Sequence, residues 1–144
     1  MAASKNPLTA DDRRFLAAIV HQVWRSAQVF VAVAMERGPL EARAAIDDLG
    51  AWAASQHGML ATRRTRAVTA LGLRVGREML EDIQRICRRL GQMLNGLERA
   101  TDGNEAAEEE ALRIIEGVVT WTSLMASQLG ITRHLRPQML WFDR

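Results

Sequence analysis

The sequence carries a run of arginines spaced to share one face of a helix. Seven arginines between positions 63 and 99 point within about 60° of the direction of Arg63 when each residue advances by about 100°. They are Arg63, Arg66, Arg74, Arg77, Arg85, Arg88 and Arg99. Guanidinium groups form paired hydrogen bonds to phosphate oxygens. This spacing therefore predicts a surface that follows the backbone of a nucleic acid.

Acidic residues within the same stripe leave other interpretations open. Glu81 lies inside the stripe, where it could form ion pairs with Arg77 and Arg85 at i,i+4 spacing. A solvated helix face has such a pattern, and so does a surface that binds an acidic protein. One such acidic surface is the helix expected to begin at Glu105. We favour nucleic acid because arginines outnumber acids on this face and cluster where acidic neighbours are missing.

The chain has no motif that reads base sequence, such as a zinc finger or an aromatic platform within the stripe. We therefore expect contact with the backbone of RNA or single-stranded DNA, without base specificity. The expected contact residues, including two that flank the stripe, are Arg63, Arg64, Arg66, Arg74, Arg77, Arg85, Arg88 and Arg89.

Residues for catalysis or metal binding are sparse. His21, His57 and His134 have no spacing typical of metal ligands, and Cys87 falls on an apolar helix face as expected of an inert thiol. Arg14 and His21 have the R-x6-H spacing seen in helical ribonucleases of the HEPN class, which leaves a nuclease as an open alternative. We nevertheless expect a protein that is not an enzyme and that has no metal or cofactor.

Composition is typical of a single helical domain. The 144 residues have a formal net charge of +2, with 48% hydrophobic residues. Residues 59–99 hold nine arginines and four acids, whereas residues 100–130 hold one arginine and six acids. The start of the chain does not read as a signal peptide, and the apolar stretch Val29–Met35 is too short to span a bilayer. We expect a cytoplasmic protein that does not contact membranes.

Apolar residues recur at helical spacing along most of the chain. The pattern predicts an all-α bundle of four to five helices at residues 9–130, after a loose tail at 1–8 and before a C-terminal tail at 131–144. Thr9 and Asp12 have capping-box spacing at the first helix. The expected helices are Ala10–Arg37, Leu40–His57, Met59–Arg99 and a last one from Glu105 to about Gly130.

Two glycines leave it open whether the long third helix is continuous. Gly72 and Gly76 could break it, which would rotate Arg63 and Arg66 away from the other arginines. They also fall on its apolar face, where a small residue lets another helix approach closely. We favour a continuous helix.

The last residues carry an apolar cluster after Pro137. Met139, Leu140, Trp141 and Phe142 follow one another there. Trp141 and Phe142 are candidate anchors for a pocket on a partner protein. With the helical spacing, this cluster suggests an alternative function, a homo-oligomeric adaptor that binds proteins and no nucleic acid.

The chain resembles the small helical subunits of CRISPR effector ribonucleoproteins. The resemblance rests on size, helical composition, the arginine stripe and the spacing of alanine, aliphatic and tryptophan residues in EEEALRIIEGVVTWTSLMASQLG. It implies a non-catalytic antiviral-defence subunit that contacts a nucleic-acid backbone through its arginines. It also implies packing against copies of itself and against a larger protein subunit.

Overall fold

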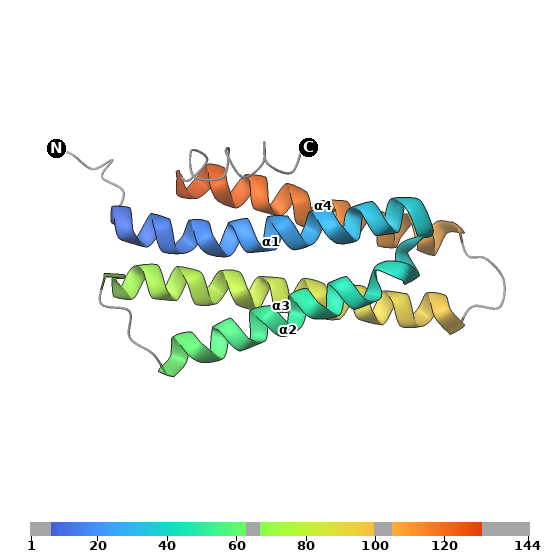
Figure 1. The fold of residues 1–144 in the computed structure, drawn as a ribbon, viewed down its shortest axis with the longest axis horizontal. Helices are drawn as coiled ribbons and strands as arrows, with labels where there is room; N and C mark the ends of the chain where they lie inside the picture. Colours follow the sequence, from blue (N-terminus) through green and yellow to red (C-terminus); the bar gives the residue numbers. More distant parts are fainter. Residues whose placement is uncertain (1–6, 63–66, 100–104, 131–144) are drawn as a thin grey trace.

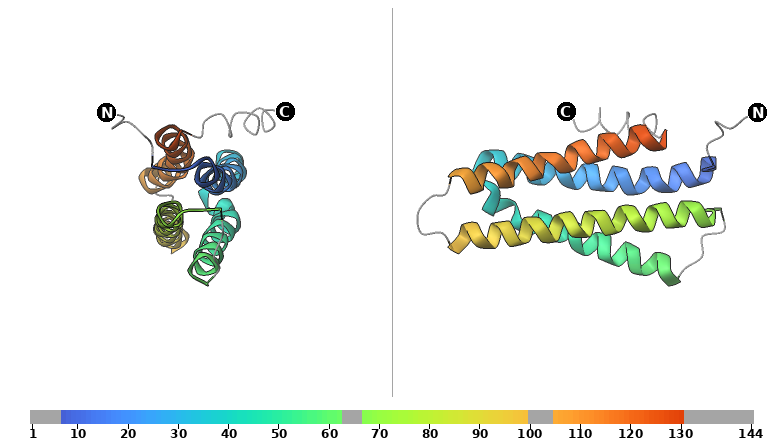
Figure 2. Two further views of the ribbon diagram at one scale, coloured as in Figure 1. Left: turned by 90° about the vertical axis from the view of Figure 1, so that its left-hand side faces the viewer. Right: turned by 180° about the vertical axis from the view of Figure 1, so that it is seen from behind.

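Four α-helices form an antiparallel bundle in the computed structural model, which describes residues 7–62, 67–99 and 105–130. The predicted all-α bundle is confirmed. The elements are α1 (Ala10–Arg37), a short 3₁₀ helix η1 (Pro39–Ala42), α2 (Arg43–Thr62), α3 (Ala70–Arg99) and α4 (Glu105–Leu129). Successive helices run in opposite directions, so α1 and α3 begin at the same end of the bundle (Figure 1). The end view places the helices at four corners, with α4 diagonal to α2 (Figure 2).

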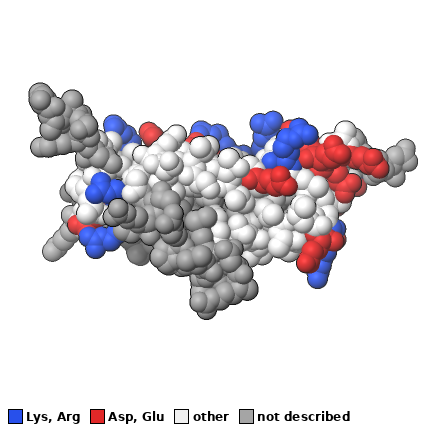
Figure 3. All heavy atoms as spheres, turned by 90° about the horizontal axis from the view of Figure 1, so that it is seen from above, with Lys and Arg blue, Asp and Glu red and all other residues white. Residues whose placement is uncertain are grey.

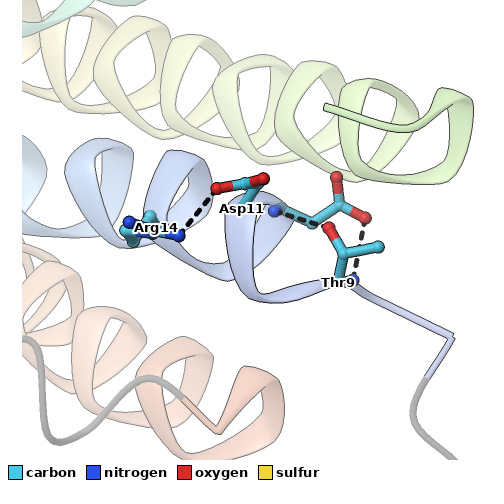
Figure 4. Close-up of polar contacts among 4 residues, drawn as sticks. Thr9, Asp11 and Arg14 are labelled. Carbon is cyan, nitrogen blue, oxygen red and sulfur yellow. Dashed lines mark hydrogen bonds and ion pairs between the residues drawn. The ribbon is translucent and has the colours of Figure 1, made fainter. Parts of the chain in front are cut away.

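Helix α1 has the bounds and the capping box that the sequence predicts. The Thr9 hydroxyl accepts a hydrogen bond from the Asp12 backbone N–H at 3.0 Å, and the Asp12 carboxylate accepts one from the Thr9 N–H at 3.1 Å (Figure 4). Gly38 ends the helix at φ 97°, a conformation that favours glycine, and Pro39 follows.

The length and apolar composition of α1 also meet the criterion for a membrane-spanning helix. Its most apolar window is 18 residues long, and 44% of that window is buried inside the bundle. This window is longer than the stretch Val29–Met35 considered above. The core helix of a protein in water passes the same test, so this property alone assigns no location.

The Asp12 carboxylate also caps the start of α3. Its Oδ1 accepts the Thr69 backbone N–H at 2.8 Å, and its Oδ2 accepts the Thr69 hydroxyl hydrogen at 2.6 Å. The Thr69 hydroxyl oxygen in turn accepts the Gly72 N–H at 3.1 Å, as the N-cap residue of a helix does. Asp12 is fully removed from solvent. Burial raises the pKa of its carboxyl, but the hydrogen bonds from Thr69 and Thr9 outweigh this and hold the pKa below its ordinary value.

The predicted continuous helix over Met59–Arg99 is wrong. Helix α2 ends at Thr62, and α3 begins at Ala70. The break lies before Gly72 and Gly76, because the cap at Thr69 starts a new helix there. The arginines at positions 63–66 therefore do not belong to α3.

Gly72 and Gly76 instead let α3 pack closely on α1. A Cβ atom on Gly72 would lie 2.5 Å from Asp12 Oδ1, and one on Gly76 would lie 2.7 Å from the Phe15 ring. Both glycines are buried. The expectation that small residues on this face admit another helix is confirmed.

The second helix differs from its predicted bounds of Leu40–His57. Its first residues form η1, and α2 continues through Gly58 to Thr62. A glycine inside a helix costs only about 1 kcal/mol, so it does not by itself end one. Leu60, beyond Gly58, packs against the core and favours the extra turn.

Helix α4 matches its prediction and completes the core. It begins at Glu105, and Gly130 follows its end at φ 68°. Helix α4 packs mainly against α1, and α2 mainly against α3. The largest fully buried side chains join all four helices at the centre: Phe30, Leu16, Ile46, Leu49, Leu80, Ile83, Leu90, Leu94 and Ile115.

Replacing Gly72 with alanine should destabilise the protein, because the new Cβ would displace the Asp12 carboxylate. Overpacking costs about 1–3 kcal/mol and alanine regains about 1 kcal/mol of helix propensity, so we expect a net loss of up to about 2 kcal/mol. Gly96→Ala is the matched control, since nothing lies within 4 Å of its Cβ position. Urea unfolding should show that Gly96→Ala is neutral or stabilising. A Gly72→Ala protein as stable as that control would contradict the close packing.

Asp12→Asn should lower the free energy of unfolding by about 2 kcal/mol near neutral pH, because hydrogen bonds to a charged acceptor are lost. The folded pKa of Asp12 is depressed, so its stabilisation is present above the unfolded pKa of about 3.9 and is lost as the pH falls through the folded value. The stability difference between wild type and variant should therefore shrink on acidification. Urea unfolding over a pH series measures it, and a constant difference would contradict this role.

Candidate nucleic-acid interface

The core-facing residues of α3 determine which of its residues face solvent. Leu80, Ile83, Leu90 and Leu94 are all 0% exposed, which fixes the rotation of the helix. The opposite side is polar. Every arginine of α3 is exposed: Arg74, Arg77, Arg85, Arg88, Arg89 and Arg99. The arrangement of these six residues on the solvent side is as the sequence predicts.

Five of these six arginines, all but Arg85, lack an acidic partner among the described residues, and Arg99 lies apart from the other four at the end of α3. Arg74, Arg77, Arg88 and Arg89 form no ion pair with any carboxylate within residues 7–62, 67–99 and 105–130. Their guanidinium groups are therefore available to an external anion. Arg74 and Arg77 form one cluster, and Arg88 and Arg89 form another. At about 1.5 Å per residue, about 16 Å of helix separates Arg77 from Arg88.

Acidic side chains interrupt the basic surface between the two clusters. Arg85 bonds to Asp82 one turn earlier, and Glu81 accepts a hydrogen bond from His57 of α2 at 2.9 Å. The sequence suggested that Glu81 would pair with Arg77 or Arg85, and the structure pairs it with His57 instead. The basic surface is thus two separate clusters, and between them Glu78, Glu81 and Asp82 outnumber Arg85.

A polar groove runs between α2 and α3 beside the second cluster. It consists of a hollow of about 450 Å³ and an adjoining one of about 220 Å³, which share Gln84 and Arg88. Asp47 and small residues of α2 line one side, and Gln92 and Asn95 of α3 line the other. His57 and Glu81 line the smaller hollow. Amide and guanidinium groups can donate hydrogen bonds to phosphate or sugar oxygens here.

The α2 contribution to this groove was missed from the sequence. It depends on the register of α2 against α3, which brings Gly50 to Cys87 and Arg43 to within 3.2 Å of Glu98. The small residues Gly50, Ala51 and Ala54 are the signal that could have indicated a close helix contact. A helix pattern alone does not specify which neighbour it faces.

Several predicted site residues lie outside the described residues. Arg63, Arg64 and Arg66 fall between α2 and α3, and Trp141 and Phe142 fall after α4. Their predicted roles stay predictions. The candidate interface is therefore built from the arginines of α3 and the groove beside them.

The residues of the alternative nuclease motif lie on α1. Arg14 is exposed and forms an ion pair with Asp11 at 2.7 Å (Figure 4). His21 is half-buried, and burial lowers the pKa of its imidazole, with a smaller lowering from Arg25. The imidazole is therefore neutral near pH 7. Within the described ranges, no group of three or more histidine, cysteine or acidic residues is placed to hold a metal ion.

Comparison with known proteins found no matching family model, no matching curated protein and no matching solved structure.

Cys87 should be chemically inert in the folded protein although it lines the polar groove. It is 8% exposed, and burial, together with the charge of Asp47, raises its pKa to about 12. Near pH 8 only about one Cys87 side chain in ten thousand is ionised to the thiolate, which is the reactive form. We expect a disulfide-exchange reagent to label the native protein about a thousand-fold more slowly than the denatured protein. Rapid labelling under native conditions would contradict this burial.

Proposed function

We propose that this chain is a non-catalytic protein that binds the phosphate backbone of RNA or single-stranded DNA through the exposed face of α3. The observation that carries the proposal is the set of exposed arginines Arg74, Arg77, Arg88 and Arg89, which no described carboxylate neutralises. A planar guanidinium donates two parallel hydrogen bonds to a phosphate and remains charged at any physiological pH.

The expected mode of binding is independent of base sequence. Helix α3 contains no aromatic residue on which a base could stack. The rigid helix holds the two arginine clusters at a fixed separation, so phosphates about five nucleotides apart on one strand can engage both. Backbone contacts of this kind set affinity and salt dependence and carry little sequence information.

The proposed biological setting is a ribonucleoprotein. The resemblance to small subunits of CRISPR effector complexes supports a cytoplasmic subunit that packs against copies of itself and against other protein subunits. Such a subunit requires a basic face for the nucleic acid and a separate face for neighbouring proteins. The arginines of α3 fit the first requirement.

The adaptor function remains a second candidate because one face of the bundle carries few charged side chains near its centre (Figure 3). Figure 3 looks down on α1 and α4 and shows a white central area, with acidic side chains gathered at the end where α4 begins. Val29, Met35 and Leu124 are 54%, 63% and 53% exposed. Exposed apolar side chains of this kind favour contact with another protein.

The test is the fluorescence anisotropy of a labelled single strand, measured as a function of salt concentration. Four engaged arginines should give a log–log slope of about −3, at roughly −0.7 per phosphate. The triple variant Arg77→Gln, Arg88→Gln, Arg89→Gln should reduce the slope to about −1, because only one of the four arginines remains.

The matched control removes the same charge from other exposed positions. This control combines Arg14→Gln, Arg37→Gln and Arg113→Gln, whose positions lie on α1 and α4. It should leave the slope of affinity against salt concentration nearly unchanged. Equal weakening in both triple variants would show that net charge alone matters, which would contradict a specific α3 interface. The absence of binding at low salt would reject nucleic-acid binding and leave the adaptor function.

A further inference from the structure

An apolar groove lies between α3 and α4, separate from the arginine clusters. Its volume is about 470 Å³. Ile86 comes from α3 and the remaining lining residues from α4: Ile114, Gly117, Val118, Thr120, Trp121 and Leu124. Leu124 is 53% exposed, and Trp121 is half-buried. An open groove of this composition exposes apolar surface to water and is suited to an apolar occupant.

The chain itself carries an apolar segment close to this groove in sequence. Helix α4 ends at Leu129, and residues 131–144 follow Gly130. Four consecutive large apolar residues, Met139–Phe142, lie near the end of this segment. A tryptophan and a phenylalanine bury large apolar areas and are frequent anchors in pockets.

The length of the connection favours this occupant over the same segment of a second copy. Trp121 precedes Gly130 by nine helical residues, a distance of about 14 Å. The eight residues 131–138 have a root-mean-square span of about 16 Å if they behave as a flexible linker. A linker whose span matches the distance gives an effective concentration of about 1 mM. A second copy at micromolar concentration competes poorly with it.

We propose that Met139–Phe142 of this chain occupies the α3–α4 groove of the same molecule, with Trp141 as the anchor. Thr120 supplies the only side-chain hydroxyl among the residues that line this groove, and it can accept a hydrogen bond from the indole N–H. The segment then covers Trp121 and Leu124 and keeps this apolar face from self-association. This proposal does not depend on nucleic-acid binding.

The test places a nitroxide next to the segment in the full-length protein. Asp143→Cys can be spin-labelled selectively because the native thiol, Cys87, is buried with a raised pKa. We expect paramagnetic loss of the backbone amide NMR signals of Gly117, Trp121 and Leu124. Signals of exposed residues on α2, which is diagonal to α4, should be retained (Figure 2).

Three controls test whether the segment occupies this groove and whether it does so within one molecule. Leu124→Glu places a charge in the groove at an exposed position and should restore the signals, whereas Ser123→Glu, exposed but outside the lining, should not. A mixed sample combines isotope-labelled molecules that carry no nitroxide with spin-labelled molecules that carry no isotope. Loss of the groove signals in this sample would show that a second copy is the occupant, which would overturn the proposal. Retention of the groove signals in the singly labelled protein would also overturn it. Neither result affects the salt-dependence test of the α3 arginines.

Discussion

The arrangement of the bundle depends on the hydrogen bonds that the buried carboxylate of Asp12 accepts. The carboxylate accepts hydrogen bonds from the N-cap residues of two helices, Thr9 of α1 and Thr69 of α3. In an ordinary capping box the acidic residue lies three positions after the N-cap in the same helix. Here one acid serves both helices, and Gly72 occupies the corresponding position of α3, where a Cβ would strike the carboxylate. The two helix starts are thereby fixed side by side.

This junction determines how α3 is rotated and therefore which residues meet solvent. Gly72 and Gly76 face α1, so the arginines of α3 face away from it. The two flanks of α3 then differ in chemistry. Toward α2 the seam is polar and includes His57 bonded to Glu81, whereas toward α4 it is the apolar groove beside Ile86. A single helix thus separates a surface suited to phosphate from a surface suited to apolar side chains.

The sequence predicted those features that depend on local patterns. The helix α1, its capping box, the end of α4 and the outward direction of the α3 arginines follow from periodicity and cap residues. The start of a new helix at Ala70 could not be predicted, because the acid that completes the cap of α3 comes from Asp12, distant in sequence. The polar groove was missed for a similar reason, since it needs the register of α2 against α3. Local patterns do not encode interactions between segments that are distant in the sequence.

The division of the arginines into two clusters changes how the surface should act on a nucleic acid. About 16 Å of helix separates Arg77 from Arg88, whereas charges are screened over about 8 Å at physiological salt. The clusters therefore attract anions nearly independently, because Glu78, Glu81 and Asp82 outnumber Arg85 in the stretch between them. At about 3.4 Å of rise per nucleotide, a stacked strand needs about five nucleotides to reach both clusters. A long polyanion can thus gain from both clusters, whereas a single nucleotide or inorganic phosphate engages one, and this geometry favours a polymeric backbone over a small anion.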